Sequence, residues 1–416
     1  MLNLPEITVP AQVFGNKPVE EPRRRQSMVL YQTGACFRML EEALLFEGME
    51  APQGQKCTDD GLADQVTAAN SAFLFAECSG DVVEKAISLK HLVSRERTVI
   101  LIGSEDKMST AREVEKLGFY YLYWPAKKDD ILSLLHHIND DVNRSHSVNH
   151  ARAAMRIGVV GLKGGSGCTM IAGELAYSLS RESQQQVILV DHGYKGSNMH
   201  IMLGKRDLAR RKMTDTAVSH HSLTNTLDHM TAQSQLTELD PNIRYLGLES
   251  DTLTPVELYE YNNRLLLALS YDANFIIEDY SASVKIYPDP REICDLVDCI
   301  VMVVQPSLSG LHESKIFLQQ FMEVNPEMKS PARHIIVLNH NVVSHRINRK
   351  AVEEYLDQPV DIEIPYYRKA EEYLTTGKRF IDGNARQATP FRQLSRKIIG
   401  KPLVEESLLK KLFWAS

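Results

Sequence analysis

The sequence predicts an α/β protein with two domains, each built on a doubly wound parallel sheet. Three observations lead to this fold class. The chain has 416 residues, which is too long for one ordinary hydrophobic core. Short apolar runs of strand length alternate with stretches of helical periodicity, and this order gives parallel strands with helices on both faces. A polar stretch at 140–153 interrupts the alternation and predicts a linker between domains at 27–139 and 154–416.

The first domain is expected to contain buried strands at 28–31, 72–75 and 98–102, each followed by a stretch that favours a helix. At 37–50, for example, apolar side chains recur on one helical face. Residues 1–26 contain proline and glutamate and lead up to three consecutive arginines, so they predict a disordered arm.

The second domain is expected to continue the same alternation with six strands. They lie at 157–161, 187–190, 243–246, 275–277, 300–304 and 334–338. The stretch that follows the first of them, at 170–180, has the periodicity of a helix.

Composition excludes several classes of protein. The net charge of −7 argues against a general nucleic-acid binder, which normally carries a basic surplus. The six cysteines are scattered without a Cys-x-x-Cys pair, so neither a disulfide framework nor a zinc site is expected, and a reducing cytoplasm fits best. The beginning of the chain lacks the apolar core of a secretory signal, and no apolar run has the length of a membrane span.

A glycine-rich loop joins the first strand of the second domain to its first helix. The loop consists of Lys163, Gly164, Gly165, Ser166, Gly167, Cys168 and Thr169. Strand, glycine loop and helix in this order predict a phosphate-binding loop, because glycines let backbone amides ring a polyphosphate and the helix N-terminus adds partial positive charge. The Thr169 hydroxyl can bind a magnesium ion that bridges the phosphates. The alternative is a strand-to-helix turn without a ligand.

Lys163-Gly164-Gly165-x-Gly167-x-Thr169 resembles the deviant phosphate loop of the ParA/MinD superfamily, whose early lysine reaches across a nucleotide-sandwich dimer. Later segments of this chain, up to about residue 400, also resemble segments of that superfamily. The strand at 187–191 resembles the one leading to the first switch, and the strand at 271–279 resembles the one ending in the magnesium-organising aspartate. The resemblance implies ATP and Mg²⁺ as cofactors, with site residues that include Asp191, Asp279, Asn339, Ile364 and Pro365; Thr169 and Asp279 would serve the metal.

Two positions depart from that family. The family has a lysine just before the loop threonine, where this chain has Cys168, and a second acid in its first switch, where this chain has Gly193. A phosphate-bound cation and a water-orienting carboxylate each stabilise the transition state. We therefore expect ATP binding with weak or no hydrolysis and no catalytic residue. Cys168 is expected to be a small helix-starting residue; the alternative is a reactive thiolate at a helix N-terminus.

Residues 99–103 and 116–125 resemble the second half of a response-regulator receiver domain, so a flavodoxin-like first domain is expected. That family's last motif ends in Lys-Pro, whereas Trp124 precedes Pro125 here. Glu77 stands where the phospho-accepting aspartate is expected, and no acidic pair follows the first strand. Without clustered carboxylates to hold magnesium, phosphorylation is not expected. Glu77 is expected to be a surface or capping acid, and the domain a docking or dimerising module.

This pairing of domains resembles the TadZ/CpaE family of Flp (Tad) pilus assembly proteins, and residues 303–310 are similar to a stretch of that family. The resemblance implies a polar localisation factor, bound to ATP as a homodimer, that meets other pilus assembly and secretion components. It would be cytoplasmic, at the cell pole and peripheral to the inner membrane. The amphipathic stretch at 403–414 is expected either to pack as a last helix on its own core or to contact the membrane weakly.

Two other functions are left open. One is an active ParA/MinD-type positioning ATPase that acts on membrane or DNA, against which Cys168 and Gly193 argue. The other is a signalling regulator with an active receiver domain, against which Glu77 argues.

Overall fold

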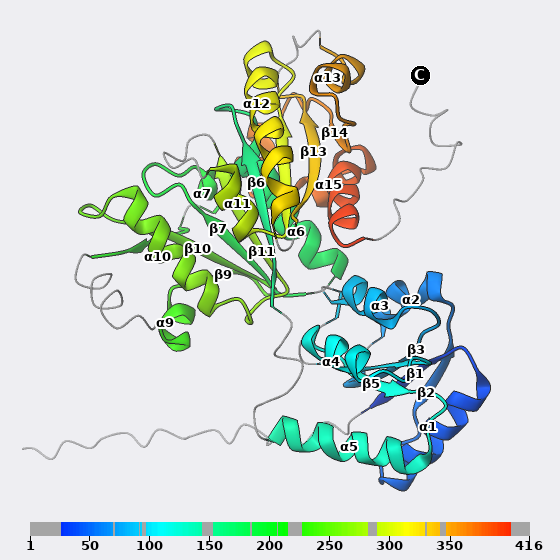
Figure 1. Cartoon of the computed structure of the whole chain (residues 1–416). Helices are drawn as coiled ribbons and strands as arrows, with labels where there is room; N and C mark the ends of the chain where they lie inside the picture. Colours follow the sequence, from blue (N-terminus) through cyan, green and yellow to red (C-terminus); the bar gives the residue numbers. More distant parts are fainter. Residues whose placement is uncertain are drawn as a thin grey trace, which may run out of the picture.

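The computed structural model describes residues 26–69, 71–90, 92–93, 97–143, 153–183, 185–205, 207–214, 227–281, 289–328, 331–341 and 347–400. It contains two separate sheets, one formed by strands within residues 27–123 and the other by strands within residues 155–364 (Figure 1). Residues 1–25 of the expected arm, most of the expected linker and the amphipathic stretch at 403–414 lie outside the described residues.

The first sheet has five parallel strands in the order β2-β1-β3-β4-β5. This is the order of flavodoxin-like doubly wound folds, as the sequence predicts. The strands are β1 (Ser27–Tyr31), β2 (Gln53–Lys56), β3 (Phe73–Glu77), β4 (Thr98–Gly103) and β5 (Tyr120–Tyr123).

Helices cover both faces of this sheet. Every residue of β3 and β4 is buried as a result. Alternate residues of β4 enter different cores: Leu101 packs with the side of α2, α3 and α4, and Ile100 packs with the side of α1 and α5. The helices are α1 (Gly34–Phe46), α2 (Leu62–Ala68), α3 (Val82–Leu89), α4 (Met108–Lys116) and α5 (Lys128–Asn143). Helix α5 runs past residue 139, the predicted end of the domain, so helix rather than linker occupies 140–143.

The second sheet has the order β14-β13-β12-β6-β11-β7-β10-β8, with β9 antiparallel to β10. All six predicted strands are present. The strands are β6 (Met155–Gly161), β7 (Val187–Asp191), β8 (Arg211–Lys212), β9 (Thr237–Asp240), β10 (Ile243–Glu249), β11 (Phe275–Ser281), β12 (Cys299–Val304), β13 (Arg333–Asn339) and β14 (Ile362–Ile364).

Two layers of helices bury this sheet. One face carries α6 (Cys168–Ser183), α7 (Met199–Met202), α14 (Ala370–Thr375) and α15 (Ala385–Ile398), and the other carries α9 (His229–Ser234), α10 (Pro255–Ala268), α11 (Pro290–Leu296), α12 (Leu308–Val324) and α13 (Arg349–Leu356). The central strands, such as β7 and β12, are therefore nearly continuous apolar runs, as strands of a parallel sheet buried on both faces require. None of the helices in the described parts is long and apolar enough to cross a membrane.

Candidate functional site

The glycine-rich loop lies between the end of β6 at Gly161 and the start of α6 at Cys168. Gly165 and Gly167 have φ angles of +80° and +89°, a left-handed conformation that favours glycine. Lys163, Gly164 and Gly165 are exposed. A Cβ added to Gly164 or Gly165 would meet no atom within 4 Å, so this stretch of backbone faces open space and can approach a ligand closely.

Two asparagines donate hydrogen bonds to backbone carbonyls of the loop, one at the end of β13 and one two residues beyond it. Asn339 donates its side-chain N–H to the Ser166 carbonyl at 2.7 Å, and Asn341 donates to the Gly165 carbonyl. Ile364 is the register partner of Asn339 on β14, and Pro365 follows it. The structure therefore brings the predicted residues Asn339, Ile364 and Pro365 to the same edge of the sheet as the loop. Asn341 was missed from the sequence.

Asp279 and Asp191, the two predicted acids, meet beside the loop. They are register partners on the parallel strands β11 and β7, and each side chain is buried. Asp279 accepts hydrogen bonds from Thr169 and Cys168. Burial and the charge of Asp191 raise the pKa of Asp279 to about 7, although these hydrogen bonds act in the opposite direction. Two adjacent buried carboxylates attract a cation.

The loop that follows β7 holds Asp191. Its Oδ1 accepts the Gly193 N–H at 2.8 Å, and its Oδ2 accepts the Tyr245 hydroxyl at 2.9 Å and the Ser197 hydroxyl. A Cβ at Gly193 would lie 2.8 Å from Asp191 Oδ1 and 3.0 Å from Ser197 Cβ. The geometry therefore leaves no room beside Asp191 for a larger residue at position 193 without a shift of the loop.

Cys168 faces the protein interior. Its thiol contacts the Val159 carbonyl at 3.0 Å and Asp279 Oδ1 at 3.2 Å, and only 2% of the residue is exposed. Burial and the neighbouring Asp279 charge raise the pKa of this thiol well above its usual value. Burial and the raised pKa argue against the alternative of a reactive thiolate, since the thiolate is the nucleophilic form. Cys168 is the first residue of α6.

These residues have the chemistry that a magnesium–nucleotide requires. The open glycine loop offers amide groups, Lys163 offers an exposed cation, and Thr169 and Asp279 offer oxygen atoms. Within the described residues, no group of three or more His, Cys, Asp or Glu could hold a metal ion alone. Magnesium characteristically binds through one or two protein oxygens, with phosphate and water as its other ligands, and this donor set suits that mode.

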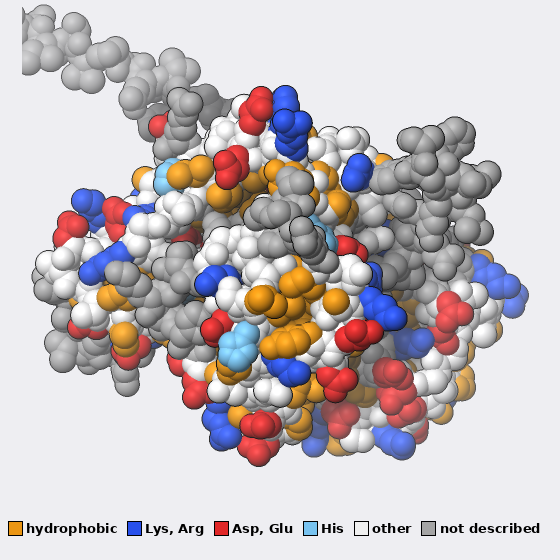
Figure 2. All heavy atoms as spheres, turned by 90° about the horizontal axis from the view of Figure 1, so that it is seen from above, with side chains coloured by type: hydrophobic (Ala, Val, Ile, Leu, Met, Phe, Trp, Pro, Cys, Tyr) orange, Lys and Arg blue, Asp and Glu red, His pale blue; other side chains and the backbone are white. Residues whose placement is uncertain are grey.

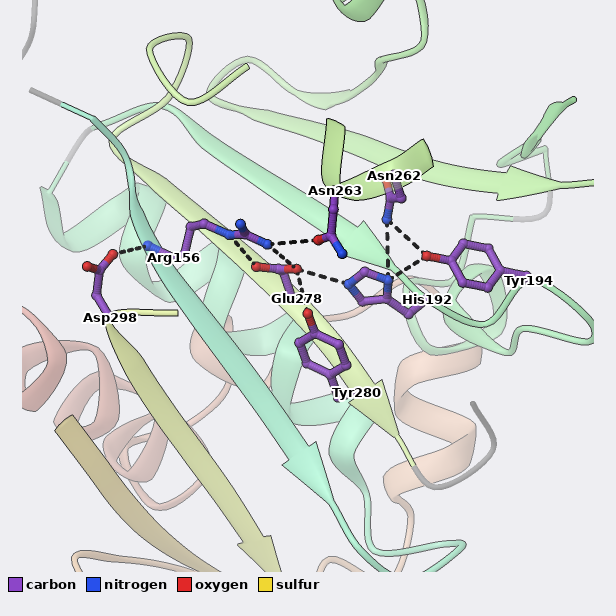
Figure 3. Close-up of polar contacts among 8 residues, drawn as sticks. All are labelled: Arg156, His192, Tyr194, Asn262, Asn263, Glu278, Tyr280 and Asp298. Atoms are coloured by element: carbon purple, nitrogen blue, oxygen red, sulfur yellow. Dashed lines mark hydrogen bonds and ion pairs between the residues drawn. The ribbon is translucent and has the colours of Figure 1, made fainter. Parts of the chain in front are cut away.

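A buried polar network lies on the other face of the same strands (Figure 3). Glu278 and His192 are the sequence neighbours of Asp279 and Asp191, so strand alternation directs them away from the loop. Arg156 contacts Glu278 through Nε at 2.8 Å and Nη2 at 3.0 Å. The same carboxylate contacts His192 Nε2 at 3.0 Å and accepts the Tyr280 hydroxyl at 2.9 Å.

This network fixes the ionised form of Glu278. Burial raises its pKa, but the charge of Arg156 and the hydrogen bonds from His192 and Arg156 outweigh burial and hold the pKa at about 2. His192 also stacks on Tyr280 at a ring separation of 4.4 Å and contacts the Tyr194 hydroxyl at 2.7 Å. The network thus joins β6 and β11 to the loop that follows β7. Sequence reasoning missed it, although a charged residue inside each of two apolar strands was a visible signal.

Glu77 has a structural place in the first domain. It accepts the backbone N–H groups of Gln32 and Thr33 at 2.7 and 2.8 Å and the Thr33 hydroxyl at 2.7 Å, just before α1. Only 6% of Glu77 is exposed. Glu77 is therefore buried rather than at the surface, and it holds the backbone just before α1, whose N-cap is Thr33.

Charge is mixed on the face that looks upward in Figure 1. Apolar side chains gather near the middle of this face, and acidic and basic side chains surround them (Figure 2). Among the described residues visible in Figure 2, acidic and basic side chains are interspersed.

No family model and no curated protein matches this chain. Solved structures similar to it include a ParA family ATPase from Chlorobium tepidum, at 20% identity over 58% of this chain and 99% of that chain, with a TM-score of 0.47. The MinC:MinD cell division complex of Aquifex aeolicus is similar at 15% identity over 61% and 98%, with a TM-score of 0.46. MinD of Pyrococcus horikoshii complexed with Mg-ADP is similar at 19% identity over 59% and 96%, with a TM-score of 0.45.

Proposed function

We propose that the second domain binds Mg-ATP at residues 163–169 and hydrolyses it weakly or not at all. The observation that carries this proposal is the position of Asp279 beside Thr169, next to a glycine loop whose backbone faces open space. The loop amides and Lys163 would hold the phosphates, and Thr169 with Asp279 would hold magnesium. Bound magnesium would neutralise phosphate charge and the buried acid pair.

The residues around the two acids support the proposal of weak hydrolysis. Cys168 supplies a buried thiol rather than a cation. Gly193 has no side chain and contributes only its N–H, which Asp191 accepts. The other carboxylate oxygen of Asp191 accepts hydrogen bonds from the Ser197 and Tyr245 hydroxyls. Neither position supplies a group that could orient water or offset charge in a phosphoryl-transfer transition state.

The ATP-bound chain acts as a homodimer that forms through the second domain. Lys163 is exposed at the rim of the loop, from which its flexible stem can reach the phosphates held by a second copy. The first domain serves as a docking or dimerising module, since Glu77 is engaged by backbone N–H groups rather than free to accept a phosphoryl group.

In the cell, this ATP-bound dimer localises and assembles a Flp/Tad pilus secretion system. It would act in the cytoplasm at the pole, peripheral to the inner membrane. Support comes from the resemblance of both domains to TadZ/CpaE proteins and from a site suited to holding nucleotide rather than turning it over. A fluorescent fusion at native expression level tests this role: loss of polar foci with Lys163→Ala, together with loss of pili, is expected. Normal pili in a strain lacking the protein would reject it.

Calorimetry tests the biochemical proposal. Full-length protein is expected to bind ATP with magnesium, and Lys163→Ala to weaken both binding and dimerisation, while Lys350→Ala, an exposed lysine on α13, leaves both unchanged. Phosphate release should stay near background. Absence of binding at saturating nucleotide would reject the site, and brisk phosphate release would favour the alternative of an active positioning ATPase.

A further inference from the structure

His192 follows Asp191 directly, at the point where the chain leaves β7. Its side chain belongs to the network on the other face of the sheet, and none of the residue is exposed (Figure 3). Burial of two polar ring nitrogens is costly unless both have hydrogen-bond partners. The partners of His192 come from β11, from α10 and from its own loop, so the ring joins that loop to the rest of the domain.

One ring nitrogen fixes the loop to β11. His192 Nε2 lies 3.0 Å from Glu278 Oε2. Because Glu278 is ionised, its oxygens only accept hydrogen bonds, so Nε2 carries the proton and donates it. The ring also stacks on Tyr280 with 4.4 Å between the ring centroids and 17° between the planes. Both contacts hold His192 to the strand that carries Asp279.

The other ring nitrogen fixes the turn that follows. His192 Nδ1 lies 2.7 Å from the Tyr194 hydroxyl and 3.3 Å from Asn262 Nδ2 on α10. Asn262 Nδ2 also donates to the Tyr194 hydroxyl at 3.2 Å. The backbone closes the turn, because the Tyr194 N–H donates to the His192 carbonyl at 2.9 Å. Residues 192–194 therefore form a tight turn that buried side chains hold in place.

Gly193 lies in the middle of this turn and connects it to the acid pair. The Gly193 N–H donates to Asp191 Oδ1 at 2.8 Å. The Ser197 and Tyr245 hydroxyls donate to the other oxygen, Oδ2. The position of Oδ1 therefore depends on where the turn places the Gly193 N–H, and the turn in turn depends on the two ring nitrogens of His192.

We infer that His192 is a positioning residue for the magnesium site: it holds the 192–194 turn, aims the Gly193 N–H at Asp191 and so fixes the carboxylate beside Asp279. The inference rests on the proposed binding of Mg-ATP, although the turn itself forms without a ligand. Removal of the outer partners that orient carboxylates at a metal site typically changes metal affinity by about 10–100-fold. A ring that only filled space in the core would have no such effect.

ATP binding by the full-length chain, measured by calorimetry with and without magnesium, tests the inference. His192→Leu removes both ring nitrogens but keeps the core filled, and the gain in ATP affinity that magnesium gives wild type should fall roughly tenfold or more. His192→Gln offers Glu278 an amide N–H in place of Nε2 and should keep most of that gain. Tyr280→Phe is the matched control, because it removes a different donor to Glu278 while its ring still stacks on His192; it should keep the whole gain.

Hydrogen exchange of the ligand-free chain gives a readout that needs no nucleotide. The peptide that contains Gly193 should exchange faster in His192→Leu than in wild type or Tyr280→Phe, because the turn opens more often. Tyr194→Phe, a milder change in the same turn, should shift exchange and the magnesium gain in the same direction, and it serves as the test if His192→Leu does not fold.

The two measurements together separate positioning from a structural role. Faster exchange with an unchanged magnesium gain would show that the turn is only structural and would overturn the inference, as would wild-type behaviour of the His192 and Tyr194 variants in both measurements. A wild-type chain whose ATP affinity does not respond to magnesium would reject the proposed metal site itself, and with it this role of His192.

Discussion

Asp279 stands directly opposite Asp191 on the neighbouring parallel strand, and from α6 its carboxylate is contacted by the thiol of Cys168 and the hydroxyl of Thr169. The acid pair is therefore buried without a nearby protein cation in contact among the described residues. Such an arrangement destabilises the ligand-free chain and is relieved when a cation enters.

Asp279→Asn should remove both the repulsion between the two buried carboxylates and the effect of magnesium on ATP binding. We expect the ligand-free variant to gain about 1–3 kcal/mol of unfolding free energy, because one of two adjacent buried charges is gone. Magnesium should no longer enhance ATP binding, since its protein carboxylate is lost. Chemical denaturation and calorimetry with and without magnesium measure both effects. Asp295→Asn on α11 is the exposed control; an unchanged magnesium response in Asp279→Asn would contradict the assigned role.

Glu278→Gln should destabilise the chain strongly. Removal of one partner from a buried ion pair leaves Arg156 uncompensated, which costs about 3–5 kcal/mol. The pKa of Glu278 is held at about 2 against an ordinary value of 4.5. Its contribution to stability is therefore present above pH 4.5 and is lost as the pH falls toward 2.

The pH dependence of denaturation distinguishes this pair from a surface contact. Between pH 5 and 2, wild type should lose stability more steeply than Glu278→Gln, because the variant no longer has this carboxylate to protonate. Glu313→Gln, at an exposed position on α12, should follow the wild-type curve. Parallel curves for wild type and Glu278→Gln would show that the pair does not stabilise the fold.

Two glycines of the loop should respond differently to alanine. Gly167 has a φ of +89°, and a Cβ there would lie 2.3 Å from Asn339 Nδ2. Gly167→Ala should therefore lose roughly 1–3 kcal/mol of stability. Gly164→Ala meets no atom within 4 Å, so its stability should match wild type. Both variants should bind ATP more weakly. In Gly167→Ala the loop is distorted, and in Gly164→Ala the added methyl group occupies the open side of the loop. Unchanged ATP affinity in Gly164→Ala would indicate that phosphate does not approach there.

The parts of the site that follow a local rule could be predicted from the sequence. The loop was identified because glycine spacing between a strand and a helix is a local signal, whereas Asp191 and Asp279 were predicted only from the resemblance of their segments to the ParA/MinD superfamily. Strand β2 was missed because Gln53 to Lys56 is polar and exposed, without the alternation of a half-buried strand.

Other contacts depend on register between strands that are distant in sequence. Tyr245 reaches Asp191 only because β10 pairs with β7, and Arg156 reaches Glu278 because β6 pairs with β11. Asn341 is two residues from a predicted site residue, yet its contact with the loop depends on how the chain leaves β13. No local pattern specifies such pairings, which is why the network behind the acids was not foreseen.

The substitutions at positions 168 and 193 should have opposite effects on the affinity for Mg-ATP. Cys168→Lys introduces a cation at the start of α6, where its long stem can reach bound phosphate. Tighter Mg-ATP binding by about 1.5–3 kcal/mol is expected from one charge-assisted hydrogen bond. Gly193→Asp alone should weaken binding, because its Cβ would lie 2.8 Å from Asp191 Oδ1 and would displace the loop that holds this acid.

Phosphate release at saturating ATP then tests how the two positions limit hydrolysis. Wild type is expected to remain near background, since neither position supplies a transition-state group. Cys168→Lys should remain slow despite its tighter binding, because it restores charge but no water-orienting carboxylate. The double variant Cys168→Lys with Gly193→Asp should turn over faster than either single variant, because the new ammonium and the new carboxylate act as a unit once the loop shifts. Cys168→Met, which keeps an uncharged side chain, controls for size alone. Brisk release by wild type would show that other residues perform the chemistry and would reject the weak-hydrolysis proposal.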